Sequence, residues 1–387
     1  MNKRALWLSF GGLLAMAAGI GIGRFVYTPI LPPMVEAVPL TKAQAGLIAS
    51  ANFVGYFAGA LLAAIRLPGS RRVWLLASLA VTAICLLGMG LTTVMPAFIG
   101  LRLIAGAASA FALIFSSALV IDRLSATGQG ALSAIHFAGV GVGIAVSALI
   151  VAVLLRAGAA WPTLWFASAA IAAAASLAVG WLVSPDEAPA QAAQTAVGVR
   201  LSADFAALLL SYGLFGFGYV ITATFIVDMV RGSPTLAHLE PYIWVLFGLS
   251  AVPSVAVWTG LGRRWGVLPI YAVACAVEAI GVATSALWLH PASIVISAVF
   301  VGGTFMGLTA LGLVATRSGS GDPRGRIALM TASFSFGQIL GPAFAGYVYD
   351  ASGSLATPLL VAVATLVLAA ALSLVAEARR RAVSPST

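Results

Sequence analysis

The sequence is poor in charge. Only 8% of its 387 residues are Asp, Glu, Lys or Arg, whereas about a quarter of the residues of a soluble domain are charged. Because 61% of the residues are hydrophobic, no soluble core could bury this much apolar surface, and the lipid bilayer must be the solvent. The two cysteines, Cys85 and Cys275, lie in apolar runs, which excludes a disulfide framework. We expect no metal and no cofactor.

Other absences exclude whole classes of function. The net charge of +9 comes from short basic clusters between apolar runs, so we expect no nucleic-acid partner. The three histidines, at positions 136, 238 and 290, lie in separate regions, which argues against an enzyme that acts on lipids. No loop is long enough for the output domain of a sensor. No Gly-x-x-x-x-Gly-Lys-Ser/Thr motif is present, which disfavours an ATP-driven pump.

The apolar runs predict an all-α membrane protein. A spanning helix needs about 20 mostly apolar residues, and twelve such runs cover residues 6–31, 43–65, 73–93, 97–121, 130–155, 161–183, 205–227, 241–261, 267–289, 292–316, 327–349 and 355–376. Most connections are short and carry Pro, Gly or charge. The longest, 184–204, predicts a cytoplasmic linker between one six-helix bundle at 1–183 and a second at 205–387.

The basic residues predict the orientation. With the N-terminus in the cytoplasm, 15 of the 20 Lys and Arg residues fall inside, and only Lys42, Arg156 and Arg231 fall outside. Arg24 and Arg102 lie within the membrane. This asymmetry predicts a multi-pass protein of a bacterial inner membrane with both termini in the cytoplasm.

The two halves of the sequence look alike. Gly21-Ile-Gly23 of the first span matches Gly216-Phe-Gly218 of the seventh at an offset of 195 residues, which also relates Phe10 to Phe205 and Met34 to Met229. Each match alone is weak. Together, in register with the apolar runs, they predict two pseudo-symmetric six-helix bundles that arose by duplication.

Three segments then carry a family resemblance. They are Tyr27-Thr-Pro-Ile-Leu-Pro-Pro-Met34, Arg102 with Gly106 and Ala110, and Gly337-Gln338-Ile-Leu-Gly341-Pro342. With them the chain resembles the major facilitator superfamily, and its Gly-Ile-Gly-Arg-Phe-x-Tyr-Thr-Pro segment resembles the YbfB/YjiJ-type branch. The resemblance implies a monomeric secondary transporter that moves a small molecule by alternating access. Two departures stand out: the loop 66–72 lacks the family's Asp, and Gly139-Val-Gly-Val-Gly143 replaces the Gly-Pro motif of drug-efflux members.

Arg24 is the strongest candidate for chemistry. It follows Gly19, Gly21 and Gly23 inside an apolar run, where a charge costs a few kcal/mol and therefore faces protein or water. It either anchors the anionic group of a substrate by forked hydrogen bonds or binds the carbonyl groups of a neighbouring helix. The other candidates for substrate contact are polar or aromatic residues in the spans, which serve equally well in packing: Tyr27, Asn52, Tyr56, Tyr219, Trp244 and Gln338.

Three residues are candidates for proton coupling. The resemblance ties Arg102 either to coupling or to bracing the fifth span. His136, near the inner end of the fifth span, is either a proton relay or a packing residue. Glu278 lies midway along the ninth span and could carry a proton, although that span is peripheral in the family.

These observations favour a transporter of a small organic anion that is coupled to protons. The alternative is an efflux pump for drugs or other amphipathic compounds. We expect the acidic residues of the first half, Glu36, Asp122, Asp186 and Glu187, to lie in loops. A cavity that holds Arg24 and no carboxylate disfavours a cationic drug.

Overall fold

The computed structural model describes residues 3–65, 67–184, 201–317 and 323–383. These residues form helices and no strand. Within the same ranges, twelve helical segments are long and apolar enough to cross a membrane. The predicted fold class, an all-α membrane protein with twelve spans in two six-helix bundles, is therefore confirmed. Most of the predicted linker, residues 185–200, lies outside the described residues.

The N-terminal half contains α1 (Lys3–Met16), the π-helical segment η1 (Ala17–Ile22), α2 (Tyr27–Ala37), α3 (Lys42–Ala63), α4 (Arg71–Gly90), α5 (Met95–Ala126), the 3-10 turn η2 (Gly130–Leu132), α6 (Ser133–Arg156) and α7 (Trp161–Leu182). The C-terminal half contains α8 (Ala203–Arg231), the 3-10 turn η3 (Ala237–Leu239), α9 (Glu240–Ala251), α10 (Ser254–Trp265), α11 (Val267–Leu287), α12 (Pro291–Arg317), α13 (Pro323–Ser352) and α14 (Ala356–Val383).

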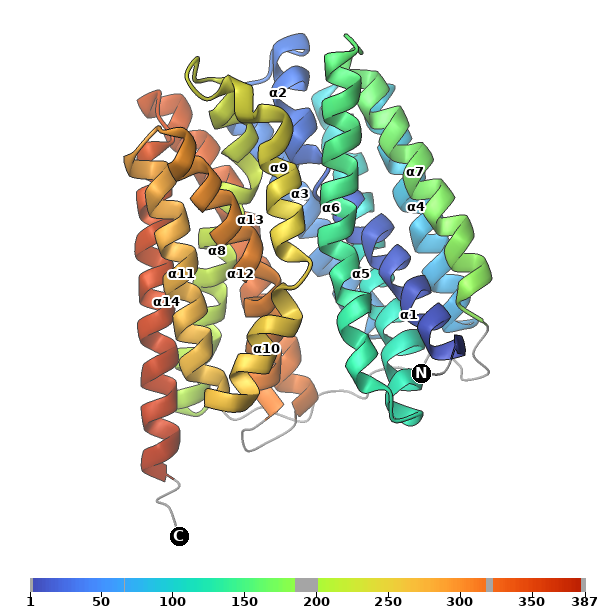
Figure 1. The fold of residues 1–387 in the computed structure, drawn as a ribbon, viewed down its shortest axis with the longest axis vertical. Helices are drawn as coiled ribbons and strands as arrows, with labels where there is room; N and C mark the ends of the chain where they lie inside the picture. The colour runs from blue at the N-terminus through green and yellow to red at the C-terminus, as the bar shows by residue number, and fades with distance from the viewer. Residues whose placement is uncertain (1–2, 66, 185–200, 318–322, 384–387) are drawn as a thin grey trace.

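The two halves lie side by side. Across the interface α3 packs against α13, α2 against α8, and α6 mainly against α9 and also against α10. Helix α1 begins and α14 ends at the same end of the molecule, which we call the terminus end (Figure 1). At the terminus end the ribbons of the two halves diverge, and at the opposite end they converge.

Local sequence signals begin several of the spans. Thr41 accepts a hydrogen bond from the amide of Gln44, whose side chain bonds back to Thr41, and this capping box starts α3. The hydroxyl of Ser70 caps α4 by accepting from the amide of Val73. Between α10 and α11 the chain turns at Gly266, whose φ of +94° disfavours any residue with a side chain.

The first span is broken, although the apolar run 6–31 predicts a continuous helix. The chain passes from α1 into η1, turns through residues 23–26 and continues as α2 to Ala37. Pro32 and Pro33 follow the predicted end of this run at residue 31 but lie inside α2, so the first span is longer than the run predicts. The glycines of η1 have a packing reason: a Cβ on Gly21 would lie 2.6 Å from the Val140 carbonyl oxygen of α6.

The eighth span is also broken. The run 241–261 predicts one helix, but α9 ends at Ala251 and α10 begins at Ser254. Pro253 stands between them, and its ring and missing N–H interrupt a helix.

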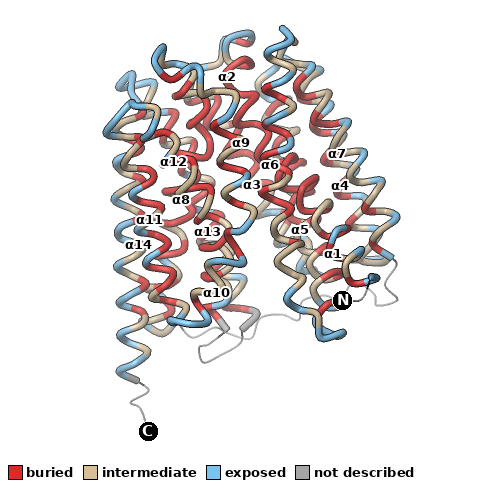
Figure 2. The backbone as a smooth tube through the Cα atoms, in the orientation of Figure 1, coloured by how far each residue is buried: buried red, intermediate tan, exposed pale blue. Residues whose placement is uncertain are grey.

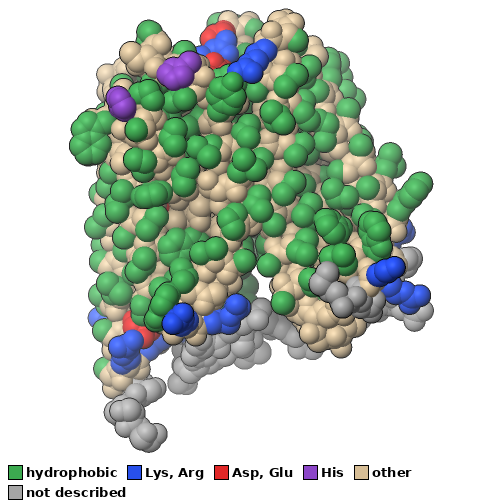
Figure 3. Space-filling model, viewed as in Figure 1, with side chains coloured by type: hydrophobic (Ala, Val, Ile, Leu, Met, Phe, Trp, Pro, Cys, Tyr) green, Lys and Arg blue, Asp and Glu red, His purple; other side chains and the backbone are tan. Residues whose placement is uncertain are grey.

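The exposed surface is suited to lipid. Burial is concentrated between the helices, and intermediate or exposed residues face outward (Figure 2). The outward side chains include large apolar ones such as Trp181, which is 91% exposed. On the face in Figure 3, hydrophobic side chains form a band between charged groups at the two ends. A multi-pass membrane protein needs such a band, because hydrocarbon offers no hydrogen bonds.

Candidate functional site

A cavity of about 270 Å³ lies between the two halves. Of the predicted substrate-contacting residues, Arg24, Tyr56 and Tyr219 line it. The remaining lining residues come mainly from α5 and α12, with single residues from α1, η1, α6, α10 and α13. At that end a notch separates the two halves in the space-filling view (Figure 3).

Arg24 stands in the turn that breaks the first span, and its side chain is 6% exposed. The guanidinium carbon lies 4.1 Å from the ring centroid of Tyr56 and 5.2 Å from that of Phe53, within the range of cation–π attraction. The guanidinium donates to the Ser109 hydroxyl at the long distance of 3.4 Å, and it also interacts with the Tyr56 hydroxyl. The Nε–H of Arg24 has no partner among the described residues. The guanidinium therefore keeps donor capacity beside the cavity.

Arg102 braces the broken span. Its guanidinium donates to the carbonyl oxygens of Gly23 and Arg24, each at 3.2 Å. The Arg24 carbonyl is available to accept from Arg102, because the Thr28 amide donates to the carbonyl of Phe25 and not to that of Arg24. The guanidinium of Arg102 thus donates to the first span, whereas the resemblance ties this position to coupling or to bracing the fifth. The Asn52 amide donates to the carbonyl of Arg102 itself at 3.1 Å, so Asn52 supports the brace and does not line the cavity.

Two other candidates hold the same span from either side. The Tyr27 hydroxyl donates to the Ala45 carbonyl of α3 at 2.9 Å. The indole N–H of Trp244 donates to the Phe25 carbonyl at 3.2 Å. Residue 29 is proline and has no N–H to donate to that carbonyl, so the carbonyl accepts from Trp244 in addition to the Thr28 amide. Neither Tyr27 nor Trp244 lines the cavity.

Gln338 reaches the cavity only through Tyr219. Its side-chain amide donates to the Tyr219 hydroxyl, and both residues are buried. The Gln338 oxygen has no hydrogen-bond partner among the described residues. Gln338 therefore fixes the position of a cavity-lining ring.

His136 lies one side chain behind the cavity wall. It is fully buried, and its Nε2 is 3.3 Å from the hydroxyl of Ser117, which lines the cavity. The Nδ1 side of the ring faces Gly12 of α1, where a Cβ would lie 2.5 Å from that nitrogen. The Ser117 hydroxyl thus connects the imidazole to the cavity.

Glu278 is buried in the C-terminal half, away from the cavity lining. Neither of its carboxyl oxygens has a hydrogen-bond partner among the described residues. The Thr304 hydroxyl, which faces it, donates instead to the Phe300 carbonyl at 2.6 Å. A carboxylate in such a site is costly to keep charged.

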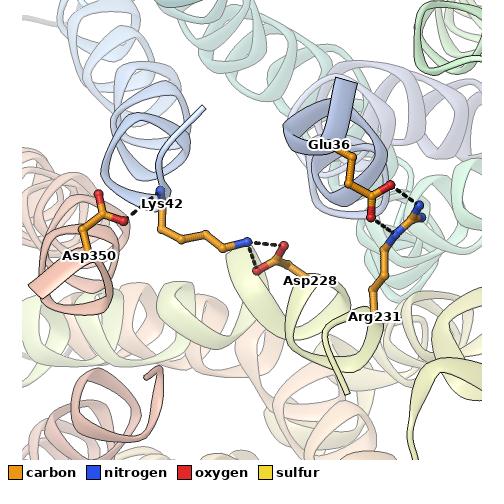
Figure 4. A network of polar contacts seen from close by, with 5 residues as sticks. All are labelled: Glu36, Lys42, Asp228, Arg231 and Asp350. Atoms are coloured by element: carbon orange, nitrogen blue, oxygen red, sulfur yellow. Dashed lines mark hydrogen bonds and ion pairs between the residues drawn. The ribbon is translucent and has the colours of Figure 1, made fainter. Parts of the chain in front are cut away.

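The end opposite the termini is closed by charged side chains that link the halves. Lys42 of α3 pairs with Asp228 of α8 through Nζ–O distances of 2.6 and 2.7 Å. Arg231 forks onto Glu36 with two contacts of 2.6 Å. Asp350 of α13 accepts from the backbone amide of Lys42 at 3.0 Å. We call Glu36, Lys42, Asp228, Arg231 and Asp350 the ionic cluster (Figure 4).

Two acidic residues that we expected in loops lie in helices. Glu36 belongs to the last turn of α2, where the extended span carries it into the ionic cluster. Asp122 belongs to α5 and lies 3.6 Å from a guanidinium nitrogen of Arg71. Helix α5 thus supplies the carboxylate that the loop 66–72 lacks.

We did not predict the ionic cluster, or most of the aromatic residues that line the cavity, from the sequence. One signal existed for the cluster: Glu36 and Arg231 are 195 residues apart, the offset that relates the two halves. The same offset relates Thr28 to Ala223, whose carbonyl accepts the Thr28 hydroxyl at 2.7 Å. Equivalent residues of two pseudo-symmetric halves touch only near the axis that relates them. No comparable pattern in the sequence pointed to the phenylalanines that line the cavity.

Comparison with known proteins places this geometry in a family. The sequence matches the family described as "Uncharacterised MFS-type transporter YbfB" over residues 16–374. No curated protein matches the chain.

The fold is also similar to that of solved transporters. A crystal structure of a mutant of the nucleoside transporter NupG matches with a TM-score of 0.74 and 16% identity, over 97% of this chain and 99% of that chain. An inward-facing, unoccupied structure of a bacterial homologue of the human lysosomal transporter Spinster matches with a TM-score of 0.66 and 16% identity, over 97% of each chain. At this identity the likeness shows the fold alone. Because the family match runs from the first span to the last, the chain belongs to the YbfB-type transporter family of the major facilitator superfamily.

Proposed function

We propose that this protein is a secondary active transporter that carries a small organic anion across the inner membrane by alternating access, coupled to protons. One observation supports the anion above all. Arg24 is the only charged residue among those that line the cavity, and it has no carboxylate partner in the described parts of the chain.

The energetics of Arg24 favour an anionic ligand. A buried guanidinium loses its hydration, and paired groups must offset that loss. Here the long hydrogen bond to Ser109, the Tyr56 hydroxyl and the neighbouring rings offset only a part of that loss, because none of them carries a negative charge. A carboxylate can accept two parallel hydrogen bonds from a guanidinium, which are among the strongest pairings in proteins. Lysine cannot reproduce this fork.

Alternating access is supported by the asymmetry of the two ends. The cavity lies toward the terminus end, and the ionic cluster joins the halves at the other end. The distribution of Lys and Arg supports a cytoplasmic position for the terminus end. The structure then corresponds to an inward-open state, and opening to the outside requires the ionic cluster to break.

Proton coupling is proposed for two residues. His136 connects to the cavity through Ser117, so a proton can pass between the imidazole and the substrate site. Glu278 is a buried carboxyl with no hydrogen-bond partner among the described residues. Arg102 is assigned to the brace, because two of its nitrogens donate to backbone carbonyls of the first span.

A second candidate function is efflux of amphipathic compounds. The observation that favours it is the largely apolar and aromatic lining of the cavity, which suits molecules that partition into lipid. The positive charge of Arg24 opposes the organic cations that such pumps commonly expel. The ligand screen described below separates the two.

The arrangement of the whole chain is proposed as follows. The protein is a monomer in the lipid of the inner membrane, with both termini in the cytoplasm. Residues 1–183 and 205–387 form the two moving units, and 184–204 is the cytoplasmic linker between them. The family implies a small-molecule substrate.

The test is a ligand screen by thermal shift on the purified protein, over organic acids, organic cations and neutral compounds. We expect organic acids to stabilise the fold. The affinity of the best acid is then measured for wild type, for Arg24→Ala and for Arg264→Ala. Arg264 is an exposed residue of α10, so its replacement removes the same charge outside the cavity.

Loss of a buried, hydrogen-bonded charge pair costs about 2–5 kcal/mol. We therefore expect Arg24→Ala to weaken binding about 30-fold or more, and Arg264→Ala to leave it unchanged. Stabilisation by cations alone would favour efflux. Wild-type affinity of Arg24→Ala for the acid would reduce Arg24 to a structural residue.

A further inference from the structure

The cavity is rich in aromatic side chains. Six of its 17 lining residues are aromatic, whereas aromatic residues make up only 9% of the chain. Four of the six form a continuous surface that we call the aromatic wall: Phe25, Tyr219, Phe305 and Phe334. Phe25 comes from the broken first span, and the other three come from α8, α12 and α13 of the opposite half.

The rings of the aromatic wall hold one another in place. The Tyr219 ring is within 4° of parallel to that of Phe334 at 6.0 Å, and within 15° of parallel to that of Phe305 at 5.6 Å. Phe25 meets Phe305 edge-on, with centroids 5.7 Å apart. Gln338 fixes the hydroxyl of Tyr219. A ligand that packs on rings already oriented loses little side-chain freedom on binding.

The wall begins beside the cationic group. The guanidinium carbon of Arg24 lies 5.9 Å from the ring centroid of Phe25. One small ligand can therefore touch both features, with an anionic group on Arg24 and a flat body along the rings.

The polar groups of the lining argue against a substrate rich in hydroxyl groups. Besides Arg24, only Tyr56, Ser117, Tyr219 and Thr309 carry polar side-chain atoms. The Thr309 hydroxyl already donates to the Phe305 carbonyl at 2.8 Å. The Tyr219 hydroxyl accepts from Gln338. A sugar-like ligand would leave several of its hydroxyl groups without partners, which costs free energy.

We propose that the substrate is an aromatic carboxylate, or an equally flat conjugated organic acid, whose ring packs on the aromatic wall while its carboxylate binds Arg24. This inference rests on the proposed function, since it takes the anion site as given, and it adds the body of the molecule. Ring–ring contacts contribute beyond the burial of apolar area, so the wall discriminates a flat aromatic body from a saturated one of the same skeleton.

The test compares three probes on the full-length protein in lipid nanodiscs, with empty nanodiscs subtracted. The probes are 2-naphthoate, decahydro-2-naphthoate and 2-naphthamide. The second keeps the charge and the carbon skeleton but is not flat, and the third keeps the rings but has no charge. We expect naphthoate to bind about two- to tenfold more tightly than its saturated analogue. We expect the amide to bind at least tenfold more weakly than naphthoate.

The same comparison on Phe334→Leu and, separately, on Phe305→Leu locates the preference. Each variant should bring the naphthoate to decahydronaphthoate affinity ratio toward one, and thermal unfolding checks that each is folded. Equal affinity of wild type for the two acids, with weak binding of the amide, would overturn the aromatic substrate and leave the anion site standing. Equal binding of amide and acid would overturn the anion site itself, and no binding of any probe would overturn the aromatic substrate, with the anion site still decided by the screen of organic acids. The wild-type comparison decides even where one leucine variant does not fold.

Discussion

The ionic cluster gives a prediction about the balance between the two states of the transporter. In Asp228→Asn the charge that pairs with Lys42 is lost, while the size of the side chain is kept. The side chains of Lys42 and Asp228 are 17% and 10% exposed, so the pair is neither fully buried nor freely solvated. Its loss should cost between the roughly 0.5 kcal/mol of an exposed pair and the roughly 4 kcal/mol of breaking a buried one.

A central value of about 2 kcal/mol corresponds to about a 30-fold change in an equilibrium constant. The pair joins the two halves only while the outer end is closed. Its loss should therefore raise the population of the outward-open state by about that factor, provided that state remains the minor one.

The assay is the alkylation rate of a single cysteine at Ala148 of α6. Ala148 is 3% exposed and lines a pocket together with Arg231 and Glu240, so we expect a reagent to reach it faster from outside when this end opens. The native Cys85 and Cys275 are first replaced by serine. Alkylation of the reporter should accelerate about 30-fold in Asp228→Asn.

Two further variants test the reasoning. Lys42→Met removes the same pair from the other side, and combining it with Asp228→Asn should give no further acceleration. Glu377→Gln breaks a helical pair with Arg381, which is 73% exposed, and should leave the rate unchanged. An unchanged rate in Asp228→Asn, or an equal acceleration in Glu377→Gln, would refute the assignment of the cluster to the outer closure.

Three more outcomes are expected. In proteoliposomes, His136→Ala or Glu278→Gln, or both, should abolish accumulation driven by a pH gradient yet spare exchange, and normal accumulation by both variants would favour a uniport or sodium mechanism. Cysteines placed at Ser70 and Ser233 should react with an impermeant maleimide from the cytoplasm and from outside, respectively, and labelling of both from one side would contradict the orientation. Arg102→Met leaves the carbonyls of the broken span without donors and should lower the free energy of unfolding by about 2–4 kcal/mol. The thermal midpoint should fall accordingly, and an unchanged midpoint would contradict the role of Arg102 as a brace.

The twelve spans could be predicted because the requirement behind them is averaged over many residues. Lipid demands about 20 apolar residues and satisfied backbone groups in each span, and no single side chain decides the outcome. Breaks within spans depend on single residues and are harder to predict. Pro253 separates α9 from α10, yet Pro342 lies inside the continuous helix α13. Proline alone therefore does not show where a span breaks.

The candidate site could be predicted only where burial of a residue is costly. Arg24 stood out because a charge in an apolar run needs a partner. Phe305 and Phe334 did not, because phenylalanine is equally at home facing lipid, and one sequence does not show which helix face borders the cavity. Lys42 and Asp228 lie 186 positions apart and do not share the repeat offset, so nothing in the sequence linked them.

The most direct test of the anion site is exchange of a radiolabelled organic acid across proteoliposomes that contain wild type, Arg24→Lys or Arg24→Ala. The acid is the best ligand from the screen, and folding of each variant is checked by its thermal midpoint. We expect no exchange by Arg24→Ala, and exchange by Arg24→Lys only at a raised half-saturation concentration, because charge remains but the forked geometry is lost. Exchange by Arg24→Ala at the wild-type rate and half-saturation concentration would show that Arg24 does not bind the substrate's anionic group.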